Sequence, residues 1–405
     1  MHGGEARGSL LDVREVGVLG AGAMGTGIAQ VAAAAGHSVI VVDPFAASVD
    51  KAEQSVRKGL AREVEKGRLT ADAAKAIEKR MQFEVDASEE YVSLRNCGLV
   101  IEAIVEDLEA KKRAFRAIEK IVRDDCVLAT NTSSLSVAAV AAACERPGRV
   151  IGMHFFNPAT VLPLVEVVGA ITSDGAIVES ARALAEQWGK VPVTARDTPG
   201  FIVNRVARPF YGESLRIYEE GIADFATIDW AMREVGGFRM GPFELMDLIG
   251  NDVNYTVTTS VFEALGYDPR YRPSITQRRM VEAGRLGRKS GVGYYDYRNG
   301  ASKPEPLADR ALGGRIVDRV VAMLINEAAD ALHFGIASAA DIDLAMTKGV
   351  NYPKGLLQWG DEIGLKEVLR RLAELHDVYG EDRYRASPAL KLLVRQGRGF
   401  HGARQ

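Results

Sequence analysis

A histidine and a glutamate twelve residues apart are the residues of this chain best suited to acid–base chemistry. His154 ends an apolar strand, and Glu166 lies within another apolar run, from Leu164 to Val168. A carboxylate in such a strand usually needs a partner. Glu166 could fix the tautomer of the His154 imidazole and stabilise its charged form, so that the imidazole exchanges a proton with a substrate hydroxyl. The alternative is a strand-end histidine in water and a glutamate on an edge strand.

A glycine-rich turn near the N-terminus has the spacing of a dinucleotide-binding site. Gly20, Gly22 and Gly25 follow an apolar run and open a small-residue helix, predicted over 26–35. They would permit a tight turn, backbone approach to a pyrophosphate and close helix–strand packing, respectively. Asp43 lies 23 residues after Gly20, where it would accept from a ribose 2′-hydroxyl and repel a 2′-phosphate. The pattern predicts NAD rather than NADP. The alternative is a tight turn that binds nothing.

Two further polar segments could hold a reacting oxygen. The segment Asn131-Thr-Ser-Ser134 follows an apolar strand, and it could cap the next helix or present the Ser133 hydroxyl at the sheet edge. Asn204 lies on the first helical turns of the next domain, where it could face a neighbouring helix or point back across the cleft. The nicotinamide supplies or takes a hydride, so the protein must move a proton and hold the oxygen.

The first half of the chain alternates short apolar runs with helical patterns, which favours a parallel sheet covered by helices on both faces. Strands are predicted over 16–19, 39–42, 99–102, 127–129, 150–154 and 164–168. Two polar helices around Lys66-Gly-Arg68 interrupt this pattern, and the stretch from Lys51 to Arg80 holds nine Lys/Arg against five Asp/Glu. Composition favours a solvated helical hairpin there over a basic arm that meets a phosphate-bearing ligand.

The second half repeats itself. The sequence Asp197 to Gly200 marks a boundary, and a long amphipathic helix is predicted over 201–219. Segments starting at Gly200, Ile228 and Asp247 recur 114 residues later, and 270–272 recurs as 383–385. This steady shift predicts a duplicated helical domain. The expected organisation is a disordered lead (1–12), a dinucleotide-binding domain (13–197) and two helical domains (198–299 and 307–405), the first of which serves the active site, since Asn204 becomes Asp318 in the second.

Composition limits the classes of function. The chain has 405 residues, 47% of them hydrophobic, and a net charge of −3, so no nucleic-acid role follows. No apolar run is long enough to span a bilayer, and the first nine residues have no signal-peptide core. The three cysteines, Cys97, Cys126 and Cys144, show no CxxC spacing and suggest buried thiols in a reducing compartment. We expect a cytoplasmic protein with no membrane partner and no metal site.

Seven motifs, taken together and in order, closely resemble the L-3-hydroxyacyl-CoA dehydrogenases, near the 3-hydroxybutyryl-CoA dehydrogenase branch. The resemblance covers roughly residues 14 to 297 and implies a Rossmann-type, mostly parallel α/β sheet with a helical hairpin insertion, followed here by two tandem all-α domains. It depends on these segments: Gly20-Ala-Gly-Ala-Met-Gly25, Ile101-Glu-Ala-Ile-Val-Glu106, Asn131-Thr-Ser-Ser-Leu135, His154-Phe-Phe-Asn-Pro158, Pro199-Gly-Phe-Ile-Val-Asn-Arg205, Met240-Gly-Pro-Phe-Glu-Leu245 and Gly287-Arg-Lys-Ser-Gly-Val-Gly-Tyr294.

The resemblance implies a role for each matching residue. His154 would be the general base in oxidation and the general acid in reduction, with Glu166 as its orienting partner. Ser133 and Asn204 would bind the C3 oxygen. The other implied roles are Asp43 on the adenosine ribose, Glu106 and Lys111 around the cofactor, Asn157 near the nicotinamide end, Lys289 closing over the cofactor site, and Lys66 on the phosphates of coenzyme A. For the hairpin, the resemblance therefore favours a phosphate-binding arm, whereas composition alone favoured a solvated helical hairpin.

The implied activity is the NAD-dependent interconversion of an (S)-3-hydroxyacyl-CoA and a 3-oxoacyl-CoA, short-chain substrates such as 3-hydroxybutyryl-CoA and acetoacetyl-CoA being expected. A gulonate-type sugar-acid dehydrogenase and a non-catalytic, crystallin-like protein are the alternatives. Simple family members pair through a single helical domain as homodimers, whereas longer multifunctional relatives carry two such domains. We expect the second copy here to pack on the first as an internal pseudo-dimer, in a monomer or homodimer. Nothing resembles a hydratase domain.

Overall fold

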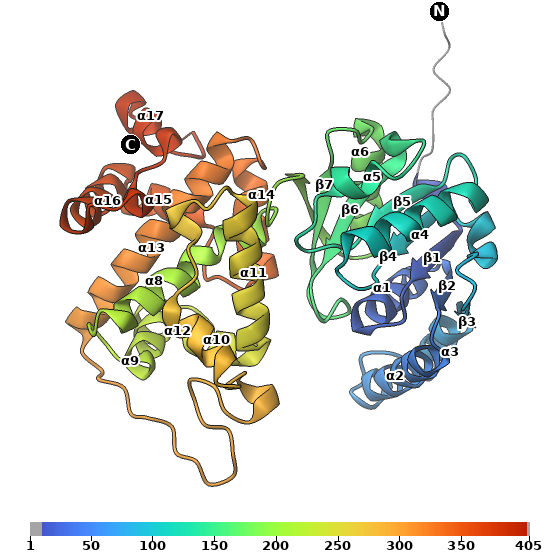
Figure 1. Cartoon of the computed structure of the whole chain (residues 1–405), viewed down its shortest axis with the longest axis horizontal. Coiled ribbons are helices and arrows are strands. Elements are labelled where there is room, and N and C mark those ends of the chain that lie inside the picture. The colour runs from blue at the N-terminus through green and yellow to red at the C-terminus, as the bar shows by residue number, and fades with distance from the viewer. Residues whose placement is uncertain (1–9, 403–405) are drawn as a thin grey trace, which may run out of the picture. The chain divides into compact units, whose positions relative to one another are not determined.

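The computed structural model describes residues 10–402 and divides the chain after Thr198 into two compact units (Figure 1). The first unit is built on one eight-stranded sheet with the strand order β3-β2-β1-β4-β5-β6-β7-β8. Its strands are β1 (Glu15–Leu19), β2 (Ser38–Asp43), β3 (Met81–Val85), β4 (Leu99–Glu102), β5 (Val127–Thr130), β6 (Val150–Phe155), β7 (Leu164–Gly169) and β8 (Val191–Arg196). The pairings are parallel except for β6 with β7. The predicted Rossmann-type, mostly parallel α/β sheet is confirmed.

All six predicted strands are present, but β3 and β8 were missed. Both lie at the ends of the sheet order, so each pairs on one side only. β3 carries polar residues between its apolar ones and is only partly buried. β8 contains Pro192, which cannot donate to a ladder and is tolerated on an edge strand. Neither segment reads as a continuous apolar run, which is the signal that identified the central strands.

Helices cover both faces of the sheet. They are α1 (Ala23–Ala34), α2 (Ala46–Glu65), α3 (Ala71–Lys79), α4 (Leu108–Ile121), α5 (Val137–Ala141) and α6 (Gly175–Gln187), with short 3-10 turns η1 (Leu10–Asp12), η2 (Val92–Asn96) and η3 (Pro147–Arg149). The predicted hairpin is α2 and α3. It is not merely a solvated arm, because Val49, Ala52, Val56 and Leu60 line one face of α2 and enter the core of the sheet.

The predicted disordered lead of residues 1–12 needs a correction. Residues 1–9 lie outside the described part of the chain. Residues 10–12 form η1, in which Leu10 is buried and its backbone N–H donates to Ser180 Oγ over 2.6 Å. The buried leucine ties this turn to α6, so the prediction was wrong for these three residues.

The second unit is all-helical and contains both copies of the repeat. The first copy holds α7 (Val203–Val206), α8 (Arg208–Glu219), α9 (Phe225–Trp230), η4 (Ala231–Val235), α10 (Pro242–Ile249), α11 (Asn251–Ala264), η5 (Pro269–Tyr271), α12 (Ile275–Glu282) and η6 (Arg288–Ser290). The second holds α13 (Arg310–His333), α14 (Ala339–Gly349), α15 (Leu356–Ile363), α16 (Leu365–Tyr379), η7 (Asp382–Tyr384) and α17 (Pro388–Gln396). The two copies share one compact unit rather than forming two.

The helix predicted over 201–219 is interrupted at Ala207, between α7 and α8. Pro209 in the first turn of α8 has no N–H to continue the ladder, which explains the break. The equivalent segment of the second copy has no proline and continues as the long helix α13, which packs against α8 (Figure 1).

The two copies are built by the same contacts. In the first, Asp229 accepts hydrogen bonds from the backbone N–H groups of Phe243 and Glu244, both at 2.9 Å, and so caps α10. In the second, Asp343, shifted by 114, caps α15 through the N–H groups of Leu357 (2.7 Å) and Gln358 (2.9 Å). Identical capping at the predicted shift supports the repeat as a structural duplication.

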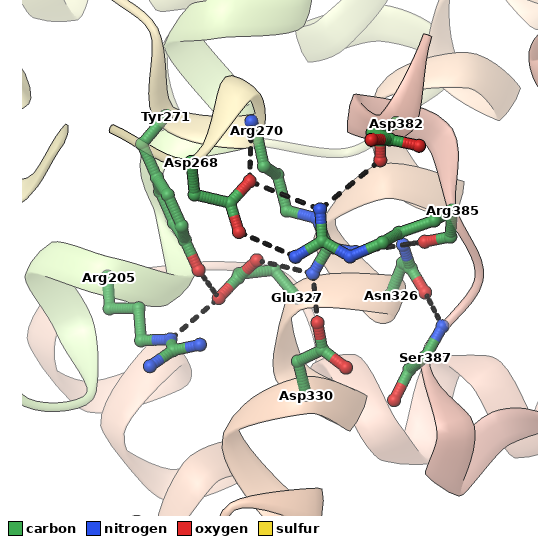
Figure 2. A network of polar contacts seen from close by, with 10 residues as sticks. All are labelled: Arg205, Asp268, Arg270, Tyr271, Asn326, Glu327, Asp330, Asp382, Arg385 and Ser387. Carbon is green, nitrogen blue, oxygen red and sulfur yellow. Dashed lines mark hydrogen bonds and ion pairs between the residues drawn. The ribbon is translucent and has the colours of Figure 1, made fainter. Parts of the chain in front are cut away.

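The two copies contact each other through buried ion pairs, and a carboxylate from each copy binds arginines of the other. Glu327 on α13 accepts from Arg205 Nε at 2.7 Å and from Arg270 Nη1 at 3.2 Å, and also from the Tyr271 hydroxyl (Figure 2). Its equivalent in the first copy, Glu213, contacts three second-copy residues in the same way: Arg319 at 2.9 Å, Arg383 at 3.5 Å and the Tyr384 hydroxyl at 3.1 Å. Each copy therefore supplies the carboxylate that neutralises the arginines of the other.

Substituting Glu327 with glutamine should destabilise the second unit strongly. The change leaves the buried guanidinium groups of Arg205 and Arg270 without their shared carboxylate, and breaking a buried pair in this way costs about 3–5 kcal/mol. Glu213→Gln, its counterpart, should cost a similar amount. The free energy of unfolding from urea titration measures both.

Glu374→Gln is the matched surface control, since Glu374 pairs with Arg370 in an exposed position and should cost less than about 1 kcal/mol. A loss for Glu327→Gln no larger than that of the control would show that the exchanged carboxylates do not hold the copies together.

Candidate active site

His154 and Glu166 face one another across the antiparallel strands β6 and β7. The two residues are direct partners in the register, and His154 Nδ1 lies 2.6 Å from Glu166 Oε2. Glu166 is fully buried, and His154 is 6% exposed. A carboxylate at this distance holds the proton on Nδ1, so Nε2 carries the lone pair. The predicted pair is present in the geometry that general-base chemistry requires.

Glu106 organises the loop that carries Ser133. Its Oε1 accepts from the Thr132 hydroxyl at 2.6 Å and from the backbone N–H groups of Ser133 (3.0 Å) and Ser134 (3.2 Å). Burial alone would raise the pKa of Glu106, but the charge of Lys111 and these hydrogen bonds outweigh it and lower the pKa below its ordinary value. Glu106 is therefore an anion that fixes the loop after β5.

Lys111 lies behind Glu106. It is 1% exposed, and its Nζ lies 2.6 Å from Glu102 Oε1 and 3.3 Å from Glu106 Oε2. Glu102 also accepts from the Thr130 hydroxyl at 2.7 Å, which ties β4 to β5. Lys111 was predicted around a cofactor, and in this arrangement it would act there through Glu106.

Asn131 connects this loop to the histidine strand. Its Oδ1 accepts from the backbone N–H of Phe155 at 2.8 Å, directly after His154. Sequence reasoning assigned roles to Ser133 and Glu106, but it gave none to Asn131, Thr132 or Glu102. Their positions in the sequence could have identified them. Glu102 ends one buried strand, and Asn131 and Thr132 follow another, at the edge where ligands of α/β sheets bind.

The glycine turn between β1 and α1 has the shape that a pyrophosphate needs. Gly20 has φ +104°, and a Cβ there would lie 2.6 Å from Ala103 O. A Cβ on Gly25 would lie 1.9 Å from Gly20 O, so only glycine allows the helix to pack this closely on the strand. Gly22 is the N-cap of the twelve-residue helix α1, and a Cβ on it would meet no protein atom within 4 Å. The open space at Gly22 lies where the helix N-terminus would receive phosphate oxygens.

Asp43 ends β2 beside this turn. Its Oδ2 accepts from Ala21 N at 2.8 Å and its Oδ1 from Phe45 N at 2.9 Å. Both carboxylate oxygens retain a second lone pair, so the group can still accept from a ribose hydroxyl. The residues present fit a dinucleotide at this edge of the sheet.

The remaining predicted site residues are distributed over both units. Asn157 is exposed after β6, and Lys66 is exposed at the end of α2, where its Nζ lies 3.7 Å from Glu63. Asn204 lies on α7, and Lys289 lies in η6, where it pairs with Asp252 at 2.5 Å. The first unit thus brings together Ser133, His154 and Glu166 with the glycine turn. The roles of Asn204, Lys289, Asn157 and Lys66 stay predictions.

Comparison with protein families gives matches over nearly the whole chain. Residues 15–198 match the NAD binding domain of 3-hydroxyacyl-CoA dehydrogenase. The C-terminal domain of the same family matches twice, over 200–297 and 314–401. The double match falls on the two copies identified from the internal repeat.

Individual relatives agree. The chain is 38% identical to a 3-hydroxyadipyl-CoA dehydrogenase of Escherichia coli K12, over 94% of this chain and 98% of that protein. It is also 38% identical to the human mitochondrial hydroxyacyl-coenzyme A dehydrogenase, over 71% of this chain and 92% of that protein.

Among solved structures, a 3-hydroxybutyryl-CoA dehydrogenase of Escherichia coli K12 superposes with a TM-score of 0.89 at 37% identity, covering 95% of this chain and 99% of that one. The His154–Glu166 pair, the glycine turn and the matches along the chain lead to one conclusion: the chain belongs to the 3-hydroxyacyl-CoA dehydrogenase family of NAD-binding oxidoreductases.

Proposed function

We propose that this protein interconverts (S)-3-hydroxyacyl-CoA and 3-oxoacyl-CoA thioesters with NAD, and that short acyl chains are its substrates. The single observation that carries the proposal is the buried His154–Glu166 pair at the carboxyl end of β6, in the same unit as a glycine turn shaped for a dinucleotide. Relatives named for 3-hydroxybutyryl-CoA and 3-hydroxyadipyl-CoA support a thioester substrate over the sugar-acid alternative.

His154 acts first on the hydroxyl of the substrate. In oxidation its Nε2 accepts the C3 hydroxyl proton, and Glu166 stabilises the imidazolium that results. Bound NAD⁺ supplies the acceptor for the hydride that leaves C3. Ser133, on the loop that Glu106 fixes, and Asn204, on α7, donate hydrogen bonds to the C3 oxygen. The reverse direction returns the proton from His154 to that oxygen.

We assign the ligand-contacting roles as the family resemblance implies. Gly20, Gly22 and Gly25 carry the pyrophosphate, Asp43 the adenosine ribose, and Asn157 the nicotinamide end. Lys66 meets the phosphates of coenzyme A, and Lys289 closes over the cofactor. Lys66 is exposed on the basic hairpin, which suits a flexible contact with a mobile phosphate.

We also propose a cytoplasmic location. Cys97, Cys126 and Cys144 are free, and burial raises the pKa of Cys126 to about 12. Unpaired thiols of this kind fit a reducing compartment. None of the helices between residues 10 and 402 is both long and apolar enough to cross a membrane.

Substitution of His154 with glutamine should lower turnover about 10²- to 10⁴-fold, because the general base is lost. NADH binding should remain, since the glycine turn is untouched. Oxidation of NADH with acetoacetyl-CoA, followed at 340 nm, measures turnover, and NADH fluorescence measures binding. His376→Gln, at an exposed position of α16, is the matched control. Near-normal turnover by His154→Gln would show that the base is wrongly assigned.

The wild-type protein should use NADH far better than NADPH. The Asp43 carboxylate repels a 2′-phosphate, and Asp43→Asn removes that charge. Its single amide oxygen can accept from only one of Ala21 N and Phe45 N, which use separate oxygens of the Asp43 carboxylate. In the variant, the ratio of kcat/KM with NADH to kcat/KM with NADPH should fall about tenfold or more, as expected for the loss of about 1.4 kcal/mol of repulsion. Glu84→Gln on the neighbouring strand β3 is the control. An unchanged ratio in Asp43→Asn would remove Asp43 from the ribose site.

We propose that the chain is monomeric, with the second helical copy in the place of the partner with which simple family members are expected to pair. The buried exchange of Glu327 and Glu213 between the copies supports this arrangement. Sedimentation equilibrium should give a mass near 43.8 kDa that does not change with protein concentration. A mass of twice that value over the whole concentration range would contradict the proposal.

A further inference from the structure

A buried arginine in the second unit has no carboxylate partner. Six arginines are buried among the residues that the structure describes, and five of them pair with Asp or Glu: Arg149, Arg205, Arg270, Arg319 and Arg383. The sixth, Arg208, is 7% exposed, and its only hydrogen bond is from Nη1 to the Thr258 hydroxyl at 3.1 Å. Arginine stays protonated in proteins, so a full positive charge is buried there without an anion.

The surroundings of Arg208 are polar but carry no negative charge. Its guanidinium lies over the Tyr211 ring, 5.0 Å from the centroid. Thr258 also accepts from Gln277 Nε2 at 3.2 Å, and Gln277 donates to Asn254 Oδ1 at 2.5 Å. Two donors nine-tenths buried remain without a partner, Arg208 Nε and the hydroxyl of Tyr352. Burial raises the pKa of Tyr352 well above its ordinary value, although the charge of Arg208 opposes the shift, so this hydroxyl stays a donor.

The second copy shows that the fold does not need this polar cluster. At the repeat shift, Arg208, Asn254, Thr258 and Gln277 correspond to Ala322, Val368, Leu372 and Leu390, all fully buried. The same helices pack there around an apolar core. The copy that has lost Asn204 to Asp318 has thus also lost the arginine and its polar neighbours. The cluster belongs to the copy that carries the predicted site residue.

The spacing between Arg208 and Asn204 indicates which part of the proposed substrate Arg208 would meet. Arg208 follows Asn204 by four residues, and Ala207 between α7 and α8 keeps right-handed helical dihedral angles (φ −78°, ψ −9°). The two side chains therefore lie on one face of the helical segment, about 6 Å apart along its axis. If Asn204 meets the C3 oxygen, as in the proposed function, Arg208 lies near the distal end of a short acyl chain. In a six-carbon chain the terminal carbon is three bonds beyond C3, about 4 Å in extended form. The thioester is neutral, and the phosphates of coenzyme A lie many bonds away on the other side of C3.

We propose that Arg208 determines specificity by binding the terminal carboxylate of a dicarboxylic 3-hydroxyacyl-CoA, with the Tyr352 hydroxyl as a second donor. The inference rests on the proposed function and narrows its substrate class. A carboxylate pairs bidentately with guanidinium and would supply the anion that the buried charge lacks. A methyl-terminated chain would leave that charge uncompensated.

The test compares two 3-oxoacyl-CoA substrates that have six carbons and differ only at the end of the chain, 3-oxoadipyl-CoA and 3-oxohexanoyl-CoA. With NADH at 340 nm, wild-type kcat/KM should favour the dicarboxylic substrate. In Arg208→Met the ratio of the two kcat/KM values should fall about 10- to 100-fold, as expected for the loss of hydrogen bonds to a charged group. Arg279→Met, an exposed arginine of α12, is the matched control and should leave the ratio unchanged.

The outcomes separate the inference from the proposed function. A wild-type protein that turns over neither thioester nor acetoacetyl-CoA refutes the proposed function. A protein that is active but shows no preference for the dicarboxylic substrate, or whose ratio survives Arg208→Met, refutes only the role of Arg208. If Arg208→Met does not fold, a quadruple variant takes its place in the test. It carries the residues of the second copy at the four positions: Arg208→Ala, Asn254→Val, Thr258→Leu and Gln277→Leu. It should fold as the second copy does and lose the preference.

Discussion

The pairing of one reversed strand with its neighbour makes the proposed chemistry possible. Because β7 runs antiparallel to β6, the first residues of β7 lie beside the last residues of β6. Glu166 is thereby the direct cross-strand partner of His154, and the two side chains lie on the same face of the sheet. The single antiparallel step therefore places a fully buried carboxylate against the imidazole at the edge where the parallel strands end. Within the first unit, the glycine turn follows β1 and the loop of Ser133 follows β5, so both lie at the same edge.

The loops at this edge are held by charge rather than by apolar packing. Lys111 neutralises Glu102 and Glu106 together, and Glu106 in turn gathers the N–H groups and the hydroxyl of the loop that carries Ser133. Burying the charges of Lys111 and Glu102 is costly unless each is paired and hydrogen-bonded, and here they pair with each other, while the more exposed Glu106 also pairs with Lys111. A loop fixed in this way positions a serine more closely than a solvated loop could, which is what stabilisation of a reacting oxygen requires.

The sequence revealed most of the fold, but mainly where the physical signal was local. The central strands were readable because strands buried on both faces are continuous apolar runs. The edge strands β3 and β8 were not, because exposure and Pro192 removed that signal. The His154–Glu166 pair was anticipated from the presence of a carboxylate in an otherwise apolar strand, whereas the antiparallel register that joins the two residues was not. The exchanged ion pairs between the copies and the isolated charge of Arg208 depend on which distant residues meet, and no spacing in one sequence reports that.

Duplication within one chain allows the two copies to differ. In a symmetric homodimer each interface residue must serve both subunits, so every site residue appears twice. Here the carboxylates and arginines of the interface are kept in both copies, as Glu213 and Arg205 or as Glu327 and Arg319. The predicted site residue Asn204 is not kept, because its equivalent is Asp318, which pairs with Arg371 in an exposed position. The contacts between the copies therefore recur in both, whereas the buried Arg208 of the first copy has an alanine, Ala322, at the equivalent position of the second.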